Sequence, residues 1–271
     1  MHAFTIDLEE WFCTHNFQGV IDYENWPKLE SRVCAQAEQL LELLDRHRVK
    51  ATFFVLGWVA VHHAALLQKI AAAGHEIGCH GFSHQLTWRH SRASFQQDLR
   101  LATEAISAVS GVAPVAFRAP AFSIVEQTDW AIDVLKEEGY AIDSSVYPVG
   151  VHPEYGIGSA PLVPYLWPNG VREIPLSCVT YYGKRMPISG GAYFRFLPYP
   201  LYRKLVKRLE KEGRKLNFYI HPWEIDCNAP KVTGLPYQRY LRHYTGLRQV
   251  KPKLERLFGD FEFGTLSGVF A

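Results

Sequence analysis

The sequence lacks any apolar run approaching the roughly 20 residues that a membrane-spanning helix needs. Its first residues have neither the basic start nor the long apolar stretch of a secretory signal peptide. It also lacks a strong excess of either charge, because 29 Lys and Arg face 27 Asp and Glu. Nucleic-acid-binding proteins usually carry a strongly basic face. We therefore expect a cytoplasmic protein that does not bind nucleic acid.

Cysteine is sparse and shows no pairing pattern. The chain has five cysteines, an odd number, and no two of them have the Cys-x-x-Cys spacing. A disulfide framework is therefore not expected, and a reducing compartment fits this composition best.

No internal repeat and no low-complexity linker divides the chain, and predicted strands and helices alternate along it. This order predicts a parallel sheet, closed or open, with helices outside it. We expect one domain over residues 1–271, with a C-terminal subregion from about residue 180 packed on the same barrel. The predicted strands are 3–7, 51–55, 76–78, 115–118, 140–143, 171–176 and 216–220, and the predicted helices are 31–48, 61–73, 91–110, 126–138 and 201–211.

Two histidines four positions apart, His80 and His84, form the most informative pattern. Three intervening residues let both imidazoles face one point, as a divalent metal requires. His75 and the following glutamate look like the start of a metalloprotease helix motif, but His80 comes one residue too late for it. Gly74 and Gly78 also disfavour a helix there. We therefore interpret His75 as structural.

Acidic residues follow the first predicted strand. Strand alternation places Asp7 and Glu9 on one face and Leu8 on the other. Two carboxylates at a barrel mouth repel each other unless a cation or an arginine compensates them. One could complete a site of two histidines and a carboxylate, and the other could act as a base toward a metal-bound water. A solvated acidic loop is the alternative.

Three further candidates lie at the ends of predicted strands, where loops build active sites in parallel α/β barrels. Arg118 could hold a carboxylate by bidentate hydrogen bonds, and its alternative is an ordinary surface charge. Asp143 precedes two serines, which is also common turn chemistry. His221 follows an apolar run and precedes Pro-Trp.

The predicted helix 201–211 carries a run of basic side chains. It could contact anionic lipid headgroups or an acidic glycan at a membrane surface. The alternative is a solvated helix face beside an apolar stripe, which needs no partner. The basic residues are Arg203, Lys204, Lys207, Arg208 and Lys211.

Six segments, in this order, resemble the polysaccharide deacetylase family, the NodB-homology carbohydrate esterases, and are most similar to its exosortase-associated branch. Six matches in the right order are hard to explain by chance. They are TIDLEEWF (5–12), HGFSH (80–84), FRAPAFS (117–123), YAIDSSVYP (140–148), GGAYFR (190–195) and YIHPWEID (219–226).

The resemblance implies a distorted (β/α)7-type barrel, the NodB-homology fold, with one divalent metal for which zinc is the expected ion. It implies a hydrolase that removes acetyl groups from N-acetylated sugars in a polysaccharide or a lipid-linked oligosaccharide. Matched by motif, the implied roles are general base for Asp7, metal ligands for His80 and His84, orientation of the base for Arg118, general acid for His221 and support of this acid for Asp143.

The sequence departs from the family pattern at Leu8, where the common motif has a second aspartate that binds the metal. Family variants with Asp-x-Asp exist, so we expect Glu9 to be the third ligand, with Glu10 as the alternative. If neither reaches the metal, the protein would be inactive.

Two other functions remain as alternatives. One is a hydrolase of a linear or cyclic amide that is not a sugar, on the same fold. The other is a catalytically inactive, carbohydrate-binding relative. The retained Asp7 and His221 argue against the second, because an inactive site has no reason to keep a base and an acid together.

Overall fold

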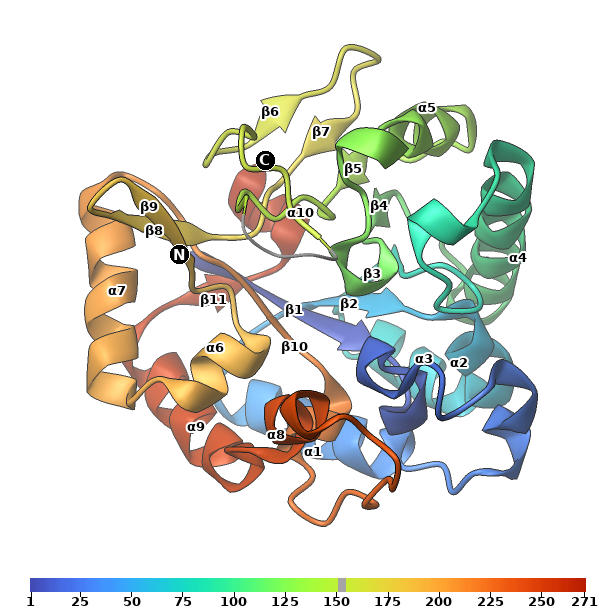
Figure 1. Cartoon of the computed structure of the whole chain (residues 1–271), viewed down its shortest axis with the longest axis horizontal. Helices are drawn as coiled ribbons and strands as arrows, with labels where there is room; N and C mark the ends of the chain where they lie inside the picture. Colours follow the sequence, from blue (N-terminus) through green and yellow to red (C-terminus); the bar gives the residue numbers. More distant parts are fainter. Residues whose placement is uncertain (151–154) are drawn as a thin grey trace.

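The computed structural model describes residues 1–150 and 155–271 of the chain. A curled sheet runs through its centre in the order β10-β1-β2-β3-β4-β5-β7-β6, and β11 also pairs with β1 (Figure 1). All neighbours are parallel except β6 and β7. The strands are β1 His2–Leu8, β2 Thr52–Val55, β3 Glu76–Cys79, β4 Ala116–Phe117, β5 Ile142–Asp143, β6 Tyr165–Leu166, β7 Arg172–Glu173, β10 Asn217–Ile220 and β11 Phe263–Gly264.

β1 is the central strand of the fold. It pairs with β2 and β10, its first residues also pair with β11, and every one of its residues is buried. Parallel strands covered on both faces are typically apolar throughout. Thr5 and Asp7 are therefore exceptions, and their polar groups need partners inside the barrel.

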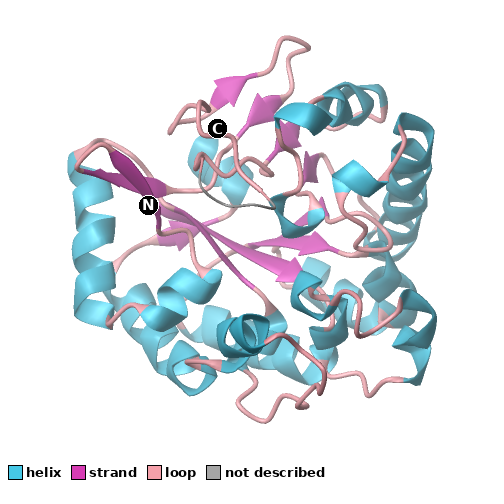
Figure 2. Cartoon of the chain, in the orientation of Figure 1, coloured by secondary structure: helices cyan, strands magenta, loops and turns pink. Residues whose placement is uncertain are grey.

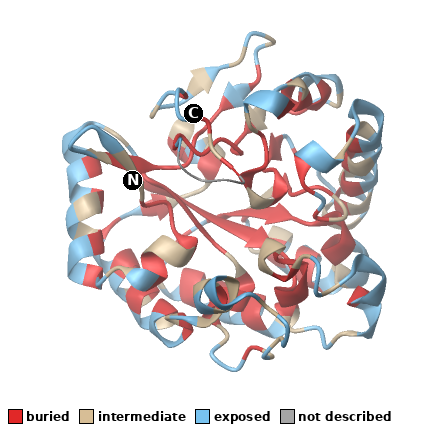
Figure 3. Ribbon diagram, in the orientation of Figure 1, coloured by how far each residue is buried: buried red, intermediate tan, exposed pale blue. Residues whose placement is uncertain are grey.

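Helices cover the outside of the sheet, as Figure 2 shows. Their inner sides are buried and their outer sides exposed (Figure 3), which is the amphipathic pattern of a surface helix. The helices are α1 Val33–Arg46, α2 Gly57–His62, α3 Ala64–Ala72, α4 Arg92–Ser110, α5 Trp130–Glu137, α6 Gly191–Phe196, α7 Tyr199–Lys211, α8 Tyr237–Tyr244, α9 Val250–Asp260 and α10 Leu266–Phe270.

The barrel is open, because the strand ladder of the described residues runs from β10 to β6 without joining its two ends. Polar contacts cross the gap instead. The Asn217 amide donates to the carbonyl of Ile174 (3.1 Å) and to the hydroxyl of Ser144 (2.9 Å). A separate hairpin, β8 Cys178–Tyr181 with β9 Lys184–Pro187, leads to a bridge between Gly190 and Tyr219. The predicted distorted barrel is therefore present in an open form.

Most predicted elements are present, with differences at their ends. The predicted helix 61–73 is in fact two helices, because His63 leaves the helical conformation between α2 and α3. His75 is structural, as predicted: its Nδ1 accepts the backbone N–H of Ala51 at 3.1 Å. Burial lowers the pKa of His75 to about 4, so the ring is a neutral acceptor.

Within residues 1–150 and 155–271, no helix is both long and apolar enough to cross a membrane. The basic side chains Lys204, Lys207 and Lys211 of α7 are exposed, whereas Val206 and Leu209 on its other side are buried. This arrangement fits the solvated face of a surface helix. The five cysteines are free thiols.

Candidate metal centre and active site

The predicted site residues meet at the carboxyl ends of four parallel strands. Glu9 follows β1, His80 follows β3, Arg118 follows β4 and His221 follows β10. Because these strands are parallel, their carboxyl ends share one edge of the barrel. Residues far apart in the chain thus face a common pocket.

Glu9, His80 and His84 form a compact group of metal-binding atoms. One ligand atom from each lies within 4.8 Å of the others, and all three residues are buried. Glu9 Oε2 lies 2.6 Å from His84 Nε2. Burial alone would raise the pKa of Glu9, but the charges and hydrogen bond of the neighbouring histidines lower it to about 2. Glu9 is therefore an anion directed at the histidine pair.

The donor set of this group fits a divalent cation. The ring nitrogen Nδ1 of His80 lies 2.7 Å from the carbonyl of Arg118, which leaves Nε2 for a ligand. Such a bond to the second ring nitrogen is typical of metal-binding histidines. Burial lowers the pKa of His80 to about 4, so the ring is neutral, as ligation requires. The nearest polar atom to the buried Glu9 Oε2 is Nε2 of His84, itself a potential ligand atom, as expected of two ligands of one ion.

Glu10, the alternative third ligand, has another role. Its carboxylate accepts a hydrogen bond from Ser31 and others from the backbone N–H groups of Arg32 (3.1 Å) and Val33 (3.3 Å). These groups lie at the start of α1, where unpaired N–H groups and the helix dipole favour an anion. The structure therefore brings Glu9 to the histidine pair, while Glu10 caps α1.

Asp7 and Arg118 form a buried ion pair next to this group. The guanidinium donates to Asp7 Oδ1 at 2.8 Å and to the hydroxyl of Thr5 at 2.6 Å. Its other nitrogens bond the carbonyl (3.1 Å) and hydroxyl (3.0 Å) of Ser144. Arg118 is completely buried, so the alternative of a surface charge is excluded. It fixes one oxygen of Asp7 and leaves the other facing the site.

His221 lies opposite Asp7 and Glu9, with its Nε2 at 3.8 Å from an oxygen of each. Its Nδ1 lies 2.9 Å from Oε1 of Glu224. Burial alone would lower the pKa of His221, but this hydrogen bond and the nearby carboxylates raise it to about 9. The ring is therefore a cation with a proton on Nε2 to donate.

The structure corrects the expectation for Asp143. The carboxyl of Asp143 is buried against Ser145 and Glu173, and burial raises the pKa of both acids, so the pair shares a proton. Glu224, not Asp143, contacts His221. The signal for Glu224 was its position three residues after His221, since η7 (Pro222–Ile225) brings the two side chains together.

Trp223 has a role in the site that the sequence interpretation, which treated it only as a loop aromatic favouring a sugar substrate, did not assign. Its ring stacks between His221 (5.1 Å between centroids) and His243 (4.3 Å). Its indole N–H donates to Glu9 Oε1 at 3.1 Å. This bond crosses 214 positions of the chain, which no local pattern reveals. Trp223 thereby orients the candidate third ligand.

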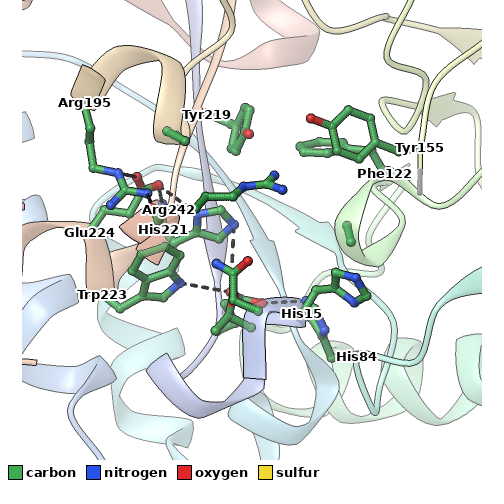
Figure 4. A pocket seen from close by; sticks show the side chains of 16 residues that line it. His15, His84, Phe122, Tyr155, Arg195, Tyr219, His221, Trp223, Glu224 and Arg242 are labelled. Carbon is green, nitrogen blue, oxygen red and sulfur yellow. Dashed lines mark hydrogen bonds and ion pairs between the residues drawn. The ribbon is translucent and has the colours of Figure 1, made fainter. Parts of the chain in front are cut away.

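Aromatic side chains form a wall of the pocket above these groups. Phe122, Tyr155, Tyr219 and Trp223 line it together with His221. Figure 4 shows Phe122 and Tyr155 on the side opposite Arg195, Glu224 and His221. Left-handed backbone at Phe122 (φ 56°) aims this ring, and strain of this kind often occurs at functional sites.

Comparison with known families matches the chain in two adjacent segments. Residues 33–142 match the family described as polysaccharide deacetylase. Residues 144–271 match a domain of unknown function, DUF3473. The first segment contains His80, His84 and Arg118, whereas His221 and Glu224 lie in the second. Strands of both segments share one sheet, and the organisation as one domain remains a prediction.

Named relatives agree with the first match. A peptidoglycan-N-acetylglucosamine deacetylase of Bacillus cereus is 26% identical over 136 residues, which are 46% of this chain and 48% of the relative. A chitooligosaccharide deacetylase of Bradyrhizobium is 35% identical over 97 residues, 35% of this chain and 42% of the relative. The chain thus spans less than half the length of these relatives.

A solved structure agrees with the fold. A Mycobacterium smegmatis protein classed as a polysaccharide deacetylase superposes with a TM-score of 0.62 at 20% identity, covering 98% of this chain and 87% of that one. The predicted NodB-type fold and the family resemblance are confirmed, while the exosortase-associated branch remains a prediction. Residues 33–142 of the chain thus match the polysaccharide deacetylase family, residues 144–271 match DUF3473, and strands of both segments lie in one sheet.

Proposed function

We propose that this chain is a metal-dependent hydrolase that removes the acetyl group from an N-acetylated sugar in a polysaccharide or a lipid-linked oligosaccharide. One observation carries this proposal. A buried group of two histidines and a glutamate lies between an anchored carboxylate, Asp7, and a histidine held by a carboxylate, His221. Metal-dependent amide hydrolysis uses this combination: a metal site that polarises the carbonyl, a base that takes a proton from water and an acid that protonates the leaving nitrogen.

Glu9, His80 and His84 would hold one divalent ion, for which zinc suits the mixed nitrogen and oxygen donors. When bound, such an ion polarises the acetyl carbonyl and lowers the pKa of a coordinated water. The remaining steps belong to side chains of the protein.

Asp7 accepts the proton of the attacking water. Its Oδ1 is held by Arg118, so Oδ2 is the oxygen available as the base. The water oxygen bonds to the carbonyl carbon and forms a tetrahedral adduct. The carbon–nitrogen bond then breaks as His221 Nε2 gives its proton to the departing sugar nitrogen. The products are acetate and a free amine, and Asp7 and His221 exchange protons with solvent before the next cycle.

The aromatic wall supports a sugar as the substrate. Phe122, Tyr155 and Tyr219 present apolar ring faces beside polar groups, a combination suited to pyranose rings. The relatives that match the first segment are named as deacetylases of peptidoglycan and chitooligosaccharides. Both names describe N-acetylated sugars.

The test is to measure metal content and acetate release from N-acetylglucosamine oligomers. We expect His80→Ala to lose both the metal and the activity, because it removes a ligand. We expect His221→Ala to retain the metal and to lose about 100- to 10,000-fold in turnover, the usual contribution of a general acid. Equal metal loss in the two variants would refute these roles. Bound metal with hydrolysis only of amides that are not sugars would reassign the substrate.

A further inference from the structure

The guanidinium of Arg195, in α6, lies directly behind the proposed acid. Arg195 is buried, and its Nε makes an ion pair with Glu224 Oε2 at 2.9 Å. Its two terminal nitrogens donate to the carbonyls of Arg242 (2.7 Å) and His243 (2.6 Å), near the end of α8. Figure 4 shows Arg195, Glu224 and His221 linked in this order at one side of the pocket. The guanidinium is thus held on several sides.

Glu224 divides its two oxygens between Arg195 and His221. Oε2 faces the guanidinium. Oε1 accepts a hydrogen bond from the backbone N–H of His221 (3.2 Å) and lies 2.9 Å from Nδ1 of the same residue. Because Nδ1 donates to Glu224, Nε2 is the nitrogen that faces the pocket. The direction of the proposed acid therefore depends on where Glu224 is held.

An unpaired Glu224 would not keep this position. Its side chain is almost completely buried, and an isolated buried carboxylate is strongly destabilised relative to a paired one. Arg195 is the cation next to it. The hydrogen bonds from Arg195 to α8 carbonyls hold the guanidinium in place, with Nε 2.9 Å from Glu224 Oε2.

We propose that Arg195 is a positioning residue that acts through Glu224 to aim Nε2 of His221 at the leaving nitrogen. This inference rests on the proposed function. It also assigns a role to the domain of unknown function: residues 144–271 supply the acid, its carboxylate partner and the arginine that holds them. The same domain supplies Trp223, which holds Glu9.

A comparison of two substrates tests this role. Departure of the sugar amine requires a proton, whereas departure of 4-nitrophenolate from 4-nitrophenyl acetate does not. We expect Arg195→Met to lower kcat on N-acetylglucosamine oligomers about 10- to 100-fold, the usual effect of losing such a partner, with KM little changed. Hydrolysis of 4-nitrophenyl acetate and the metal content should stay near wild type. Equal loss on both substrates would show that Arg195 is only structural.

A double-mutant cycle tests whether Arg195 acts through Glu224. In the background of Glu224→Gln, which removes the charge that Arg195 holds, Arg195→Met should lower kcat less than about 3-fold further. Full additivity would overturn the proposal. Arg185→Met is the matched control, because Arg185 also donates to two carbonyls, those of Pro148 (3.2 Å) and Ala160 (2.7 Å), and has no contact with Glu224 among the described residues.

Two measurements keep the proposal testable if Arg195→Met does not fold or if no sugar is deacetylated. Arg195→Lys keeps the charge but not the planar guanidinium contacts, so its activity toward the amide should lie between those of the wild type and Arg195→Met. In ¹⁵N-histidine NMR spectra, the Nδ1–H of His221 should be observed in the wild type and exchange faster with solvent in Arg195→Lys or Arg195→Met. An unchanged exchange rate would contradict the proposal without any reference to activity. A wild type that shows this protected N–H but releases no acetate would instead contradict the proposed function.

Discussion

Glu9 and Glu10 are neighbours in the chain, but their carboxylates point to different parts of the molecule. Glu9 leaves β1 on the same face as Thr5 and Asp7 and meets His84 and Trp223. Glu10, one residue further along, points the opposite way and accepts hydrogen bonds from the backbone N–H groups at the start of α1. The same period of two that places Leu8 away from the metal group also places Glu9 toward it.

The first prediction separates these two carboxylates. We expect Glu9→Ala to lower metal affinity by more than the ~10- to 100-fold caused by losing an outer partner of a ligand. We expect Glu10→Ala to retain the metal and to lower the free energy of unfolding by about 1–2 kcal/mol, through loss of the cap on α1. Metal analysis and thermal unfolding of the two purified variants measure both effects. Metal loss in Glu10→Ala would show that the cap is not its main role.

The buried pair of Asp143 and Glu173 predicts a pH effect on stability. Burial, and then the charge of Asp143, raises the pKa of Glu173 well above its ordinary value of 4.5. Such an acid takes up a proton on folding, so stability falls as the pH rises above about 4.5 toward its folded pKa. Glu173→Gln removes this dependence, and its single amide oxygen can still accept the N–H of Val146, which now donates to Glu173 Oε1 at 3.1 Å.

We therefore expect Glu173→Gln to be as stable as the wild type near pH 4.5 and more stable at pH 8. The difference should reach at least about 1.4 kcal/mol, the equivalent of one pKa unit. Unfolding in urea at several pH values measures it. Glu104→Gln, a change at an exposed glutamate of α4, is the control and should show no such trend. A constant difference across the pH range would contradict the shared proton.

At the scale of elements, helices with clear end signals were predictable from sequence. The predicted helix 91–110 matches α4 within one residue, because Ser91 caps its first turn and Gly111 ends it in a left-handed conformation. Short strands were predicted too long. The predicted strand 115–118, for example, corresponds to β4, which has only two residues. α6, α8 and the hairpin β8–β9 were not predicted. α8 has few apolar residues and buries only His243, so its position depends on contacts with distant segments.

In the site too, residues with a local sequence signal were predictable, and residues whose roles depend on distant contacts were not. His80, His84 and Asp7 were found because ligands and strand ends leave a local spacing pattern. Arg195 and Trp223 were not, because their roles depend on contacts with Glu224 and Glu9 across the fold. Asp143 was assigned by motif alone, and the hydrogen-bond geometry reassigns its role to Glu224.

Gly190 directly precedes α6 and forms a bridge with Tyr219 of β10. This contact between the two elements supports a prediction for their junction. Its φ is +139°, and a Cβ there would lie 2.0 Å from the carbonyl oxygen of Tyr219. We expect Gly190→Ala to lower the free energy of unfolding by about 3 kcal/mol, through backbone strain and overpacking. It should also lower activity, because Tyr219 is two residues before His221.

The matched control is Gly259→Ala in α9, where a Cβ meets open space. This change should stabilise the protein by about 0.5–1 kcal/mol, since alanine favours a helix over glycine. Urea unfolding of both variants and their acetate release provide the comparison. Similar small effects for the two glycines would show that the junction tolerates a side chain.

At the scale of the whole molecule, metal binding should couple to folding. The three ligands come from loops after β1 and β3 and converge only in the folded barrel. An ion that binds only the folded state stabilises it by about 2.7 kcal/mol when its free concentration is 100 times Kd. We expect zinc to raise the Tm of the metal-free protein by ~5 °C or more. Glu9→Ala should show almost no increase. Equal increases in both would place the bound metal elsewhere.

The central position of β1 has a consequence for biosynthesis. The hydroxyl of Thr5 bonds the carbonyl of Phe218, 213 positions further along the chain. At a translation rate of about 5–20 residues per second, β1 waits on the order of 10–40 s on the ribosome before β10 is made. During this time one edge of β1 has no partner strand, a state that favours aggregation and binding by chaperones. His221 and Trp223 also emerge only then, so a nascent chain carries the metal ligands well before it carries the acid. By the proposed mechanism, a nascent chain that ends before His221 therefore cannot carry out the hydrolysis.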